Sequence, residues 1–289
     1  MNIKLIVAGI LLLMLFFILG VLSYRSQLFP VKQFRNFYHA IKANTAKQIK
    51  MDMTRFNNDA YTVIFAFGQS NSANYGQTLY QCKEEVYNWY DGKIYEAGDP
   101  LKGAGGFGGS PWTRLGDLMI QNNLAQKVLI VPIGRGGTTV SGWAEGGKQH
   151  KLLLNAIGQL NSQGIKIDYV LWHQGETDNQ YNTSKETYIE KFKTIRSAFR
   201  SNHVDAPIFV AVASYIPVED ILLRKNNGCD PNIQNAQKQL AELFPDVFQG
   251  ANTDSMDKTY YRNDGLHFSD AGLWKHAELW LEILKSYSK

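Results

Sequence analysis

A serine directly after a short apolar run is the first residue of this chain whose surroundings suggest chemistry. The run Tyr61–Phe67 reads YTVIFAF, and the segment Gly68–Asn71 (GQSN) follows it. If the run is a strand, the glycine permits a tight turn and Ser70 opens a helix, with backbone N–H groups nearby to bind an oxyanion. Ser70 would then be a nucleophile. The alternative is that Ser70 only caps the helix, which is the more common use of serine there.

A carboxylate and a histidine lie three residues apart near the C-terminus. Asp264 precedes His267 in the segment DGLH, just before the last expected helix. Asp264 can accept a hydrogen bond from the Nδ1–H of His267, which leaves Nε2 free to take a proton from a serine hydroxyl. A D-x-x-H pattern is weak evidence alone. With Ser70 after the first strand, it indicates a Ser70–His267–Asp264 triad.

Two further segments follow expected strands and contain groups that stabilise negative charge. Ile133–Thr139 (IGRGGTT) is rich in glycine, which lets a backbone N–H approach a substrate closely. Its spacing differs from that of a phosphate-binding loop, and an ordinary strand-to-helix turn is the alternative. In Trp172–Asp178 (WHQGETD), the amide of Gln174 can donate to a developing oxyanion.

The other polar residues of this last segment are assigned structural roles. Glu176 and Asp178 are predicted to be hydrogen-bond acceptors that support the loop. His173 is predicted to be packed or solvated rather than a base.

Short apolar runs alternate with amphipathic stretches from residue 61 onward. The expected strands are Tyr61–Phe67, Lys127–Ile133, Ile167–Trp172, Pro207–Ala213 and Asp246–Gln249. The expected helices are Gln149–Asn161, Ser184–Arg200, one that begins at Asp230-Pro231 and one that begins near Ser269. Thr183 and Glu186 suggest a capping box for the second helix. The alternation predicts an α/β fold with a parallel sheet, whose ligands bind beyond the carboxyl ends of the strands.

The four segments, taken in order, resemble the SGNH (GDSL-type) hydrolase superfamily, and within it the sialate O-acetylesterase and carbohydrate acetylesterase branch. The branch carries G-Q-S-N, G-G-T-[ST], Q-G-E and D-G-x-H blocks. Here they read Gly68–Asn71, Gly136–Thr139, Gln174–Glu176 and Asp264–His267. The resemblance covers about residues 60–285. It implies a three-layer α/β/α flavodoxin-like fold with a central parallel sheet, and a serine esterase that removes O-acetyl groups from a carbohydrate.

The resemblance also implies a role for each triad residue. Ser70 would be the nucleophile, His267 the general base and then acid, and Asp264 the orienting carboxylate. The family needs no metal or other cofactor, and none is expected here.

The oxyanion hole implied by the resemblance combines three groups. These are the backbone N–H groups of Ser70 and Gly136 and the side-chain amide of Gln174. The spacing to Thr138 favours Gly136, although Gly137 stays an alternative.

Three aromatic residues in expected loops lie near the blocks. Tyr75, Trp112 and Trp143 are candidates for stacking on sugar rings. The alternative is that they cover apolar surface beneath the loops.

An uncharged stretch at the N-terminus predicts a membrane anchor. Residues 5–24 are long enough to cross the ~30 Å hydrocarbon core. A cleaved signal peptide is the alternative, but its apolar region would be shorter and its cleavage site better formed. We therefore expect a transmembrane anchor over residues 1–24, a basic juxtamembrane stalk over 25–58 and an SGNH-type esterase domain over 59–289.

The sequence gives two opposing indications of the side of the membrane on which the catalytic domain lies. Basic residues gather after the apolar stretch, which favours a cytoplasmic domain. The substrate class favours an extracytoplasmic one, periplasmic or extracellular, and we expect the latter.

The net charge limits the kinds of binding partner that we expect, and the two cysteines leave a disulfide open. The net charge of +4 is too small to indicate nucleic acid. The expected partners are an acetylated carbohydrate and, through the N-terminal helix, a membrane. Cys82 and Cys229 could form a disulfide in an oxidising compartment or remain two thiols.

Two other functions are compatible with the same residues. A carbohydrate O-acetyltransferase would use the same triad to pass acetyl between sugars. A non-catalytic carbohydrate-binding module would be marked by a missing triad residue, and none is missing.

Overall fold

The computed structural model describes residues 12–19, 48–49, 57–217 and 228–288. The chain divides into two units, Met1–Asn44 and Thr45–Lys289. In the first unit, residues 12–19 are helical. No helix among the described residues is long and apolar enough to cross a membrane. Most of the predicted anchor and stalk lies outside the described residues.

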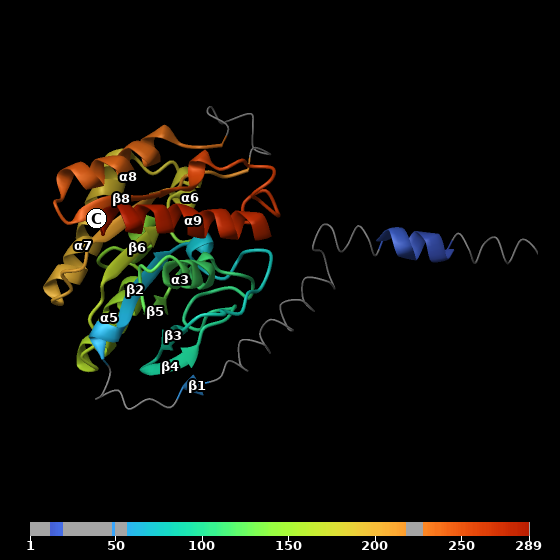
Figure 1. Cartoon of the computed structure of the whole chain (residues 1–289). Helices are drawn as coiled ribbons and strands as arrows, with labels where there is room; N and C mark the ends of the chain where they lie inside the picture. Colours follow the sequence, from blue (N-terminus) through green and yellow to red (C-terminus); the bar gives the residue numbers. More distant parts are fainter. Residues whose placement is uncertain (1–11, 20–47, 50–56, 218–227, 289) are drawn as a thin grey trace, which may run out of the picture. The chain divides into compact units, whose positions relative to one another are not determined.

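The second unit contains one sheet with helices on both faces (Figure 1). Its strands are β1 (Gln48–Ile49), β2 (Tyr61–Gly68), β3 (Val86–Tyr90), β4 (Lys93–Glu96), β5 (Lys127–Pro132), β6 (Tyr169–His173), β7 (Ile208–Val212) and β8 (Val247–Asn252). They lie in the order β1-β4-β3-β5-β2-β6-β7-β8. All five predicted strands are present as β2, β5, β6, β7 and β8.

The prediction of a purely parallel sheet is wrong at one edge. In the spatial order β3-β5-β2-β6-β7-β8, each strand is parallel to its neighbours. At the other edge, β4 runs antiparallel to both β3 and β1. Asp91 and Gly92 both have positive φ and join β3 to β4 in a two-residue turn. β1, which falls within the predicted stalk, pairs with β4 at this edge.

The α-helices of the second unit range from one turn to five turns in length. They are α3 (Pro111–Gln121), α4 (Val140–Trp143), α5 (His150–Ser162), α6 (Glu176–Gln180), α7 (Lys185–Ser201), α8 (Pro231–Leu243) and α9 (Asp270–Tyr287). Three single 3₁₀ turns are η2 (Asn58–Ala60), η3 (Ser70–Ser72) and η5 (Thr253–Ser255). The helix starts predicted at Asp230-Pro231 and near Ser269 are confirmed, and Asp230 and Ser269 are the N-caps of α8 and α9. The cap of α7 is Ser184, rather than the predicted Thr183.

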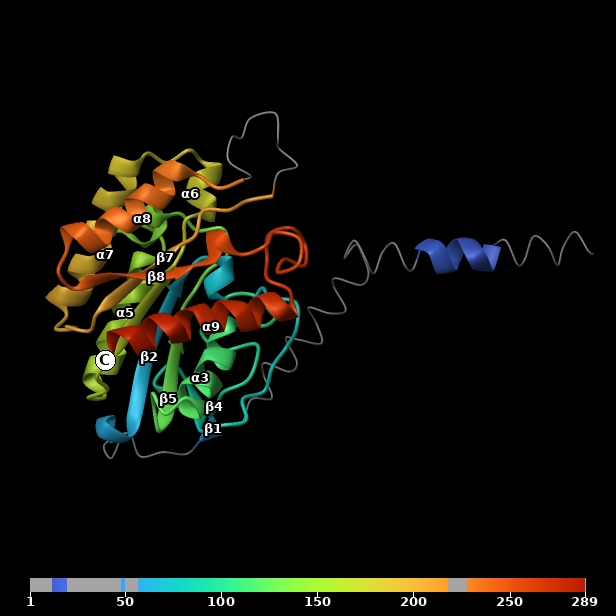
Figure 2. The same cartoon turned by 45° about the horizontal axis from the view of Figure 1, so that its top comes forward.

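The central strand β2 is mostly apolar because both of its faces are covered by helices. Successive side chains of a strand point to opposite faces. Phe65 and Phe67 enter the core beneath α5, α7 and α8, whereas Ile64 and Ala66 enter the core beneath α3 and α9. Figure 2 shows α3 and α9 on one side of the sheet and α7 and α8 on the other. The three-layer α/β arrangement is therefore confirmed.

Candidate active site

The turn after β2 can form only because residue 68 is glycine. Gly68 has a φ of 134°, and a Cβ built there would lie 2.0 Å from the backbone oxygen of His173 on β6. The N–H of Gln69 donates to that same oxygen over 3.1 Å. Ser70 follows as the first residue of η3 and is buried. The capping position belongs to Gln69, so the alternative role of Ser70 as a helix cap is not supported.

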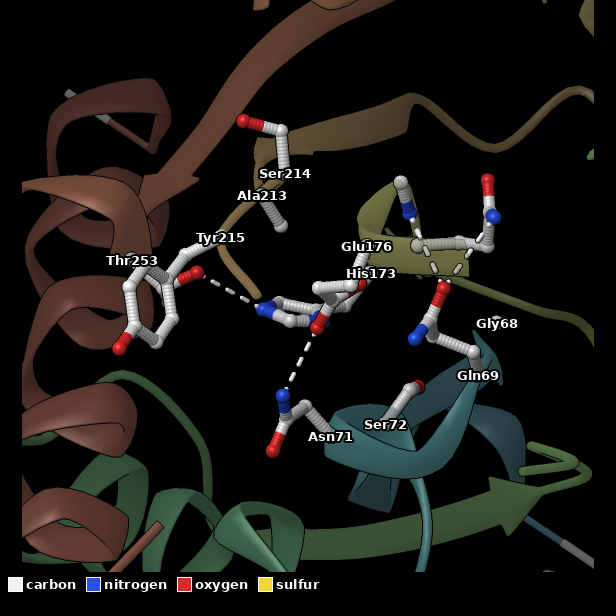
Figure 3. Close-up of polar contacts among 12 residues, drawn as sticks. Gly68, Gln69, Asn71, Ser72, His173, Glu176, Ala213, Ser214, Tyr215 and Thr253 are labelled. Carbon is white, nitrogen blue, oxygen red and sulfur yellow. Dashed lines mark hydrogen bonds and ion pairs between the residues drawn. The ribbon is translucent and has the colours of Figure 1, made fainter. Parts of the chain in front are cut away.

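The side chains on either side of Ser70 are held by α6 (Figure 3). Gln69 Oε1 accepts from the backbone N–H groups of Gly175 and Thr177 over 3.3 and 3.0 Å. Asn71 Nδ2 donates to Glu176 Oε1 over 2.7 Å in a buried hydrogen bond. The Q-G-E segment therefore anchors the G-Q-S-N segment, and Glu176 is a structural acceptor as predicted.

Gln174 lies beneath this turn and is completely buried. Its amide nitrogen donates to the Thr138 carbonyl over 3.0 Å and to the Asp178 carboxylate, and it lies 3.2 Å from Gln69 Oε1. Asp178 also accepts from the N–H of Val140 over 2.8 Å, which confirms its structural role. Both amide protons of Gln174 face protein acceptors, so its role as a hydrogen-bond donor to an oxyanion stays a prediction.

Asp264 and His267 meet as their spacing predicts. His267 Nδ1 lies 2.7 Å from Asp264 Oδ2, and the backbone N–H groups of Leu266 and His267 donate to Asp264 Oδ1 over 3.0 and 2.7 Å. Partial burial alone would raise the pKa of Asp264, but these hydrogen bonds and the charge of His267 lower it to about 2. Asp264 is therefore an ionised acceptor that anchors Nδ1 of His267.

Tyr75 joins His267 to the glycine-rich loop after β5. Its ring stacks on the His267 ring with centroids 5.3 Å apart and planes inclined by 23°. A Cβ built on Gly136 would lie 2.5 Å from the Tyr75 hydroxyl oxygen. Gly137, by contrast, is exposed and has open space where its Cβ would be. Of the two glycines, Gly136 is the one adjacent to the tyrosine that contacts His267.

The loops that carry Ser70 and His267 are also joined through their backbones. The N–H of Gln77 donates to the carbonyl of Phe268 over 2.9 Å. Within the described part of the chain, the backbone N–H groups of Ser70 and Gly136 have no hydrogen-bond acceptor. Their role as oxyanion donors stays a prediction. The Ser70–His267 proton transfer itself stays a prediction.

Two predicted sugar-stacking residues belong to the core. Trp112 lies in α3 and Trp143 at the end of α4, and both side chains are fully buried. The Trp112 indole N–H donates to the Ser72 carbonyl, and that of Trp143 donates to Thr138 Oγ1, each over 2.9 Å. The stacking prediction is wrong for both because the expected loops are helices. The alternative, that they pack beneath the loops, is confirmed.

His173 is packed in the interior, one of the two environments predicted for it. Its Nε2 lies 3.0 Å from Thr253 Oγ1, and its ring lies 4.6 Å from that of His276 (Figure 3). Burial lowers the pKa of His173 and lowers that of His276 further, because each would have to hold its charge away from water. His173 is therefore a neutral structural residue.

Two cysteines and one cavity are further features that could do chemistry. Among the described residues, no group of three or more His, Cys, Asp or Glu side chains could hold a metal ion. Cys82 and Cys229 are both free. A cavity of about 280 Å³ includes Lys166, Asp168 and Asp205, just before β6 and β7. It therefore lies at the amino edge of the sheet, opposite the blocks.

The fold and these four segments define a hydrolase of the SGNH type. A family model described as carbohydrate esterase, sialic acid-specific acetylesterase, matches residues 60–282. The chain belongs to this family and is a carboxylic ester hydrolase, a carbohydrate acetylesterase.

Solved structures agree with the fold. The chain is similar to a protein of Arabidopsis thaliana, with 17% identity, a TM-score of 0.60 and coverage of 79% of this chain and 98% of that one. It is also similar to NanS, with 15% identity, a TM-score of 0.51 and coverage of 81% and 99%. For Axe2, an acetyl-xylooligosaccharide esterase from a Geobacillus species, the values are 17%, 0.50, and 77% and 93%. No curated protein matches the chain.

Proposed function

We propose that the protein removes O-acetyl groups from a carbohydrate by a Ser70–His267–Asp264 triad and an acetyl-enzyme. Ser70 Oγ attacks the ester carbonyl carbon while His267 Nε2 takes its proton. The tetrahedral oxyanion receives hydrogen bonds from the N–H groups of Ser70 and Gly136, with Gln174 as a further candidate donor. His267 then protonates the departing sugar oxygen, and water attacks acetyl-Ser70 to release acetate.

The observation that carries this proposal is the oriented His267. Asp264 engages Nδ1 over 2.7 Å, so the tautomer with the proton on Nδ1 is favoured and Nε2 carries the lone pair. The ring lies beside Tyr75, whose hydroxyl approaches the loop of Gly136. The proposed base, His267, and the proposed oxyanion donor, Gly136, both adjoin Tyr75, which follows Ser70 by five residues.

Ser70→Ala tests the triad. We expect kcat for nitrophenyl acetate to fall on the order of 10³-fold or more, because the covalent route is lost while the oxyanion donors remain. Ser255→Ala is a control, since Ser255 is an exposed serine of η5. Hydrolysis by the Ser70 variant at the wild-type rate would remove the triad assignment.

The sugar is tested with a panel of acetylated glycans. The family description favours O-acetylated sialic acid, and acetylated surface polysaccharide and xylan are the comparisons. Acetate release is measured for each, with and without an acceptor sugar. Acetyl transfer to the acceptor in place of acetate release would indicate a transferase. Faster turnover of octanoate than acetate esters would contradict an acetylesterase.

The location of the enzyme is a separate proposal. The uncharged residues 5–24 support retention at a membrane, and a glycan substrate supports an extracytoplasmic catalytic domain. Fractionation and protease access to intact cells test it. A domain recovered in the soluble fraction, or protected until the cells are lysed, would contradict it.

A further inference from the structure

Tyr75 has a backbone that is held on both sides by a neighbouring loop. The N–H of Asn74 donates to the carbonyl of Gly105 over 2.9 Å. Gly76 and Gly109 exchange two backbone hydrogen bonds, each of 2.9 Å. Because the residues before and after Tyr75 are both fixed, the direction of its side chain is constrained.

The Tyr75 ring packs closely against the backbone of Gly106 and Gly136, where any larger residue would clash with it. A Cβ on Gly106 would lie 2.8 Å from Tyr75 Cδ2, and one on Gly136 would lie 2.5 Å from its hydroxyl oxygen. A Cβ on Gly105 would lie 3.8 Å from the same oxygen. Glycines therefore line one side of the ring, and the His267 imidazole stacks on it.

His267 needs a second restraint besides Asp264. A single hydrogen bond at Nδ1 fixes one atom of the ring but allows the ring to turn about that contact. A catalytic base must stay close to its productive geometry, because a misplacement of about 1 Å can cost on the order of 10²-fold in rate. A stacked aromatic ring restricts the plane of the imidazole, and its electron-rich face favours the imidazolium formed during the reaction.

We infer that Tyr75 is a positioning residue of this esterase, whose ring holds the plane of the His267 imidazole. The inference rests on the proposed triad. It assigns to Tyr75 a role different from sugar stacking, since the ring face turned to His267 is already occupied. Tyr75 is 38% exposed, so the rest of the ring still borders solvent.

Three variants test the inference. Tyr75→Phe keeps the ring and should retain kcat within about twofold. Tyr75→Leu removes the ring and should lower kcat about tenfold or more, with little change in KM. Phe107→Leu is the matched control, because Phe107 is a similarly exposed aromatic residue in the loop beside Tyr75 and makes no ring contact with His267.

The decisive measurement compares a small and a large substrate. A positioning role predicts the same loss of kcat for nitrophenyl acetate and for an acetylated glycan. If Tyr75→Leu raises KM for the glycan alone, the residue binds sugar and the inference is wrong. Wild-type constants on both substrates would also overturn it.

Folding and the triad are checked separately. A Tyr75→Leu melting temperature within a few degrees of the wild type shows that the variant is folded. If it is not, Tyr75→Met, which also removes the ring but fills more of its space, takes its place. If His267→Ala retains activity, the proposed triad fails. If His267→Ala is inactive while Tyr75→Leu is fully active, only the positioning role fails.

Discussion

Asn71 donates a buried hydrogen bond of 2.7 Å to Glu176, and this bond joins the turn that carries Ser70 to the start of α6. The two residues are 105 positions apart. Gln69 makes a parallel connection through Gly175 and Thr177. The turn that carries Ser70 is therefore positioned by a second loop, rather than by its own residues alone.

Glu176→Ala should destabilise the protein and slow catalysis. The buried amide of Asn71 would lose its acceptor, which costs about 1–3 kcal/mol in the free energy of unfolding. Because the Ser70 turn is then less restrained, kcat should fall as well. Urea unfolding and acetate release measure the two effects. Glu176→Gln keeps an acceptor oxygen and is the matched control. Wild-type stability and kcat in the alanine variant would contradict this reading.

Asp264→Asn should lower kcat on the order of 10³-fold or more. The asparagine amide can donate to Nδ1, which favours the tautomer of His267 that has no lone pair on Nε2. Steady-state kinetics with nitrophenyl acetate measure the loss. Asp257→Asn is a control, because Asp257 is an exposed carboxylate of the same loop that accepts backbone N–H bonds. A small effect of Asp264→Asn, equal to that of the control, would remove Asp264 from the triad.

The pKa of Asp264 makes a second prediction for the wild type. Hydrogen bonds hold it at about 2, below its usual 3.8. A carboxyl whose folded pKa is lowered stabilises the fold above the unfolded value, and that contribution is lost as the pH falls through about 2. Asp264 therefore stays ionised between pH 4 and 8. A carbon-13 NMR titration of the wild-type carboxyls measures this directly, and an Asp264 carboxyl that titrates between pH 4 and 8 would contradict it.

Gly136→Ala and Gly137→Ala should differ. A methyl group on residue 136 would meet the Tyr75 hydroxyl and displace the loop, so kcat should fall about 10²-fold. Residue 137 has open space but a φ of +69°, so alanine there should cost about 1 kcal/mol of stability with little effect on kcat. Kinetics and thermal melting of both variants test this. The reverse order would assign the oxyanion N–H to Gly137.

The buried histidines predict a dependence of stability on pH. Burial lowers the pKa of His173 and of His276 in the folded state, so the unfolded chain binds more protons just below pH 6.5. The free energy of unfolding should therefore fall as the pH drops from 7 to 5, by up to about 1.4 kcal/mol per pH unit for each histidine. Urea titrations at several pH values measure it. His276→Gln should reduce the slope, and an unchanged slope in that variant would contradict this prediction.

Local chemistry in the sequence was enough for several features. The Asp264–His267 contact spans three residues, and the caps at Asp230 and Ser269 lie within one turn of the helices they begin. The apolar strands were visible because a strand covered on both faces needs apolar side chains in both directions. The hairpin of β3 and β4 was missed, although Asp91-Gly92 between VYNWY and KIYE is a known turn signal.

Contacts between distant residues were decided by the tertiary structure. Three examples are the burial of Trp112 and Trp143, the bond of Asn71 to Glu176 and the stacking of Tyr75 on His267. Each brings together segments that are far apart in the sequence, and no local pattern predicts that they meet. The sequence determined which residues can attack, accept a proton and stabilise an oxyanion, since these are properties of residue types in short blocks. Only the packing of the sheet and its loops decided which neighbours hold them, because strand order and loop contacts depend on the whole chain at once.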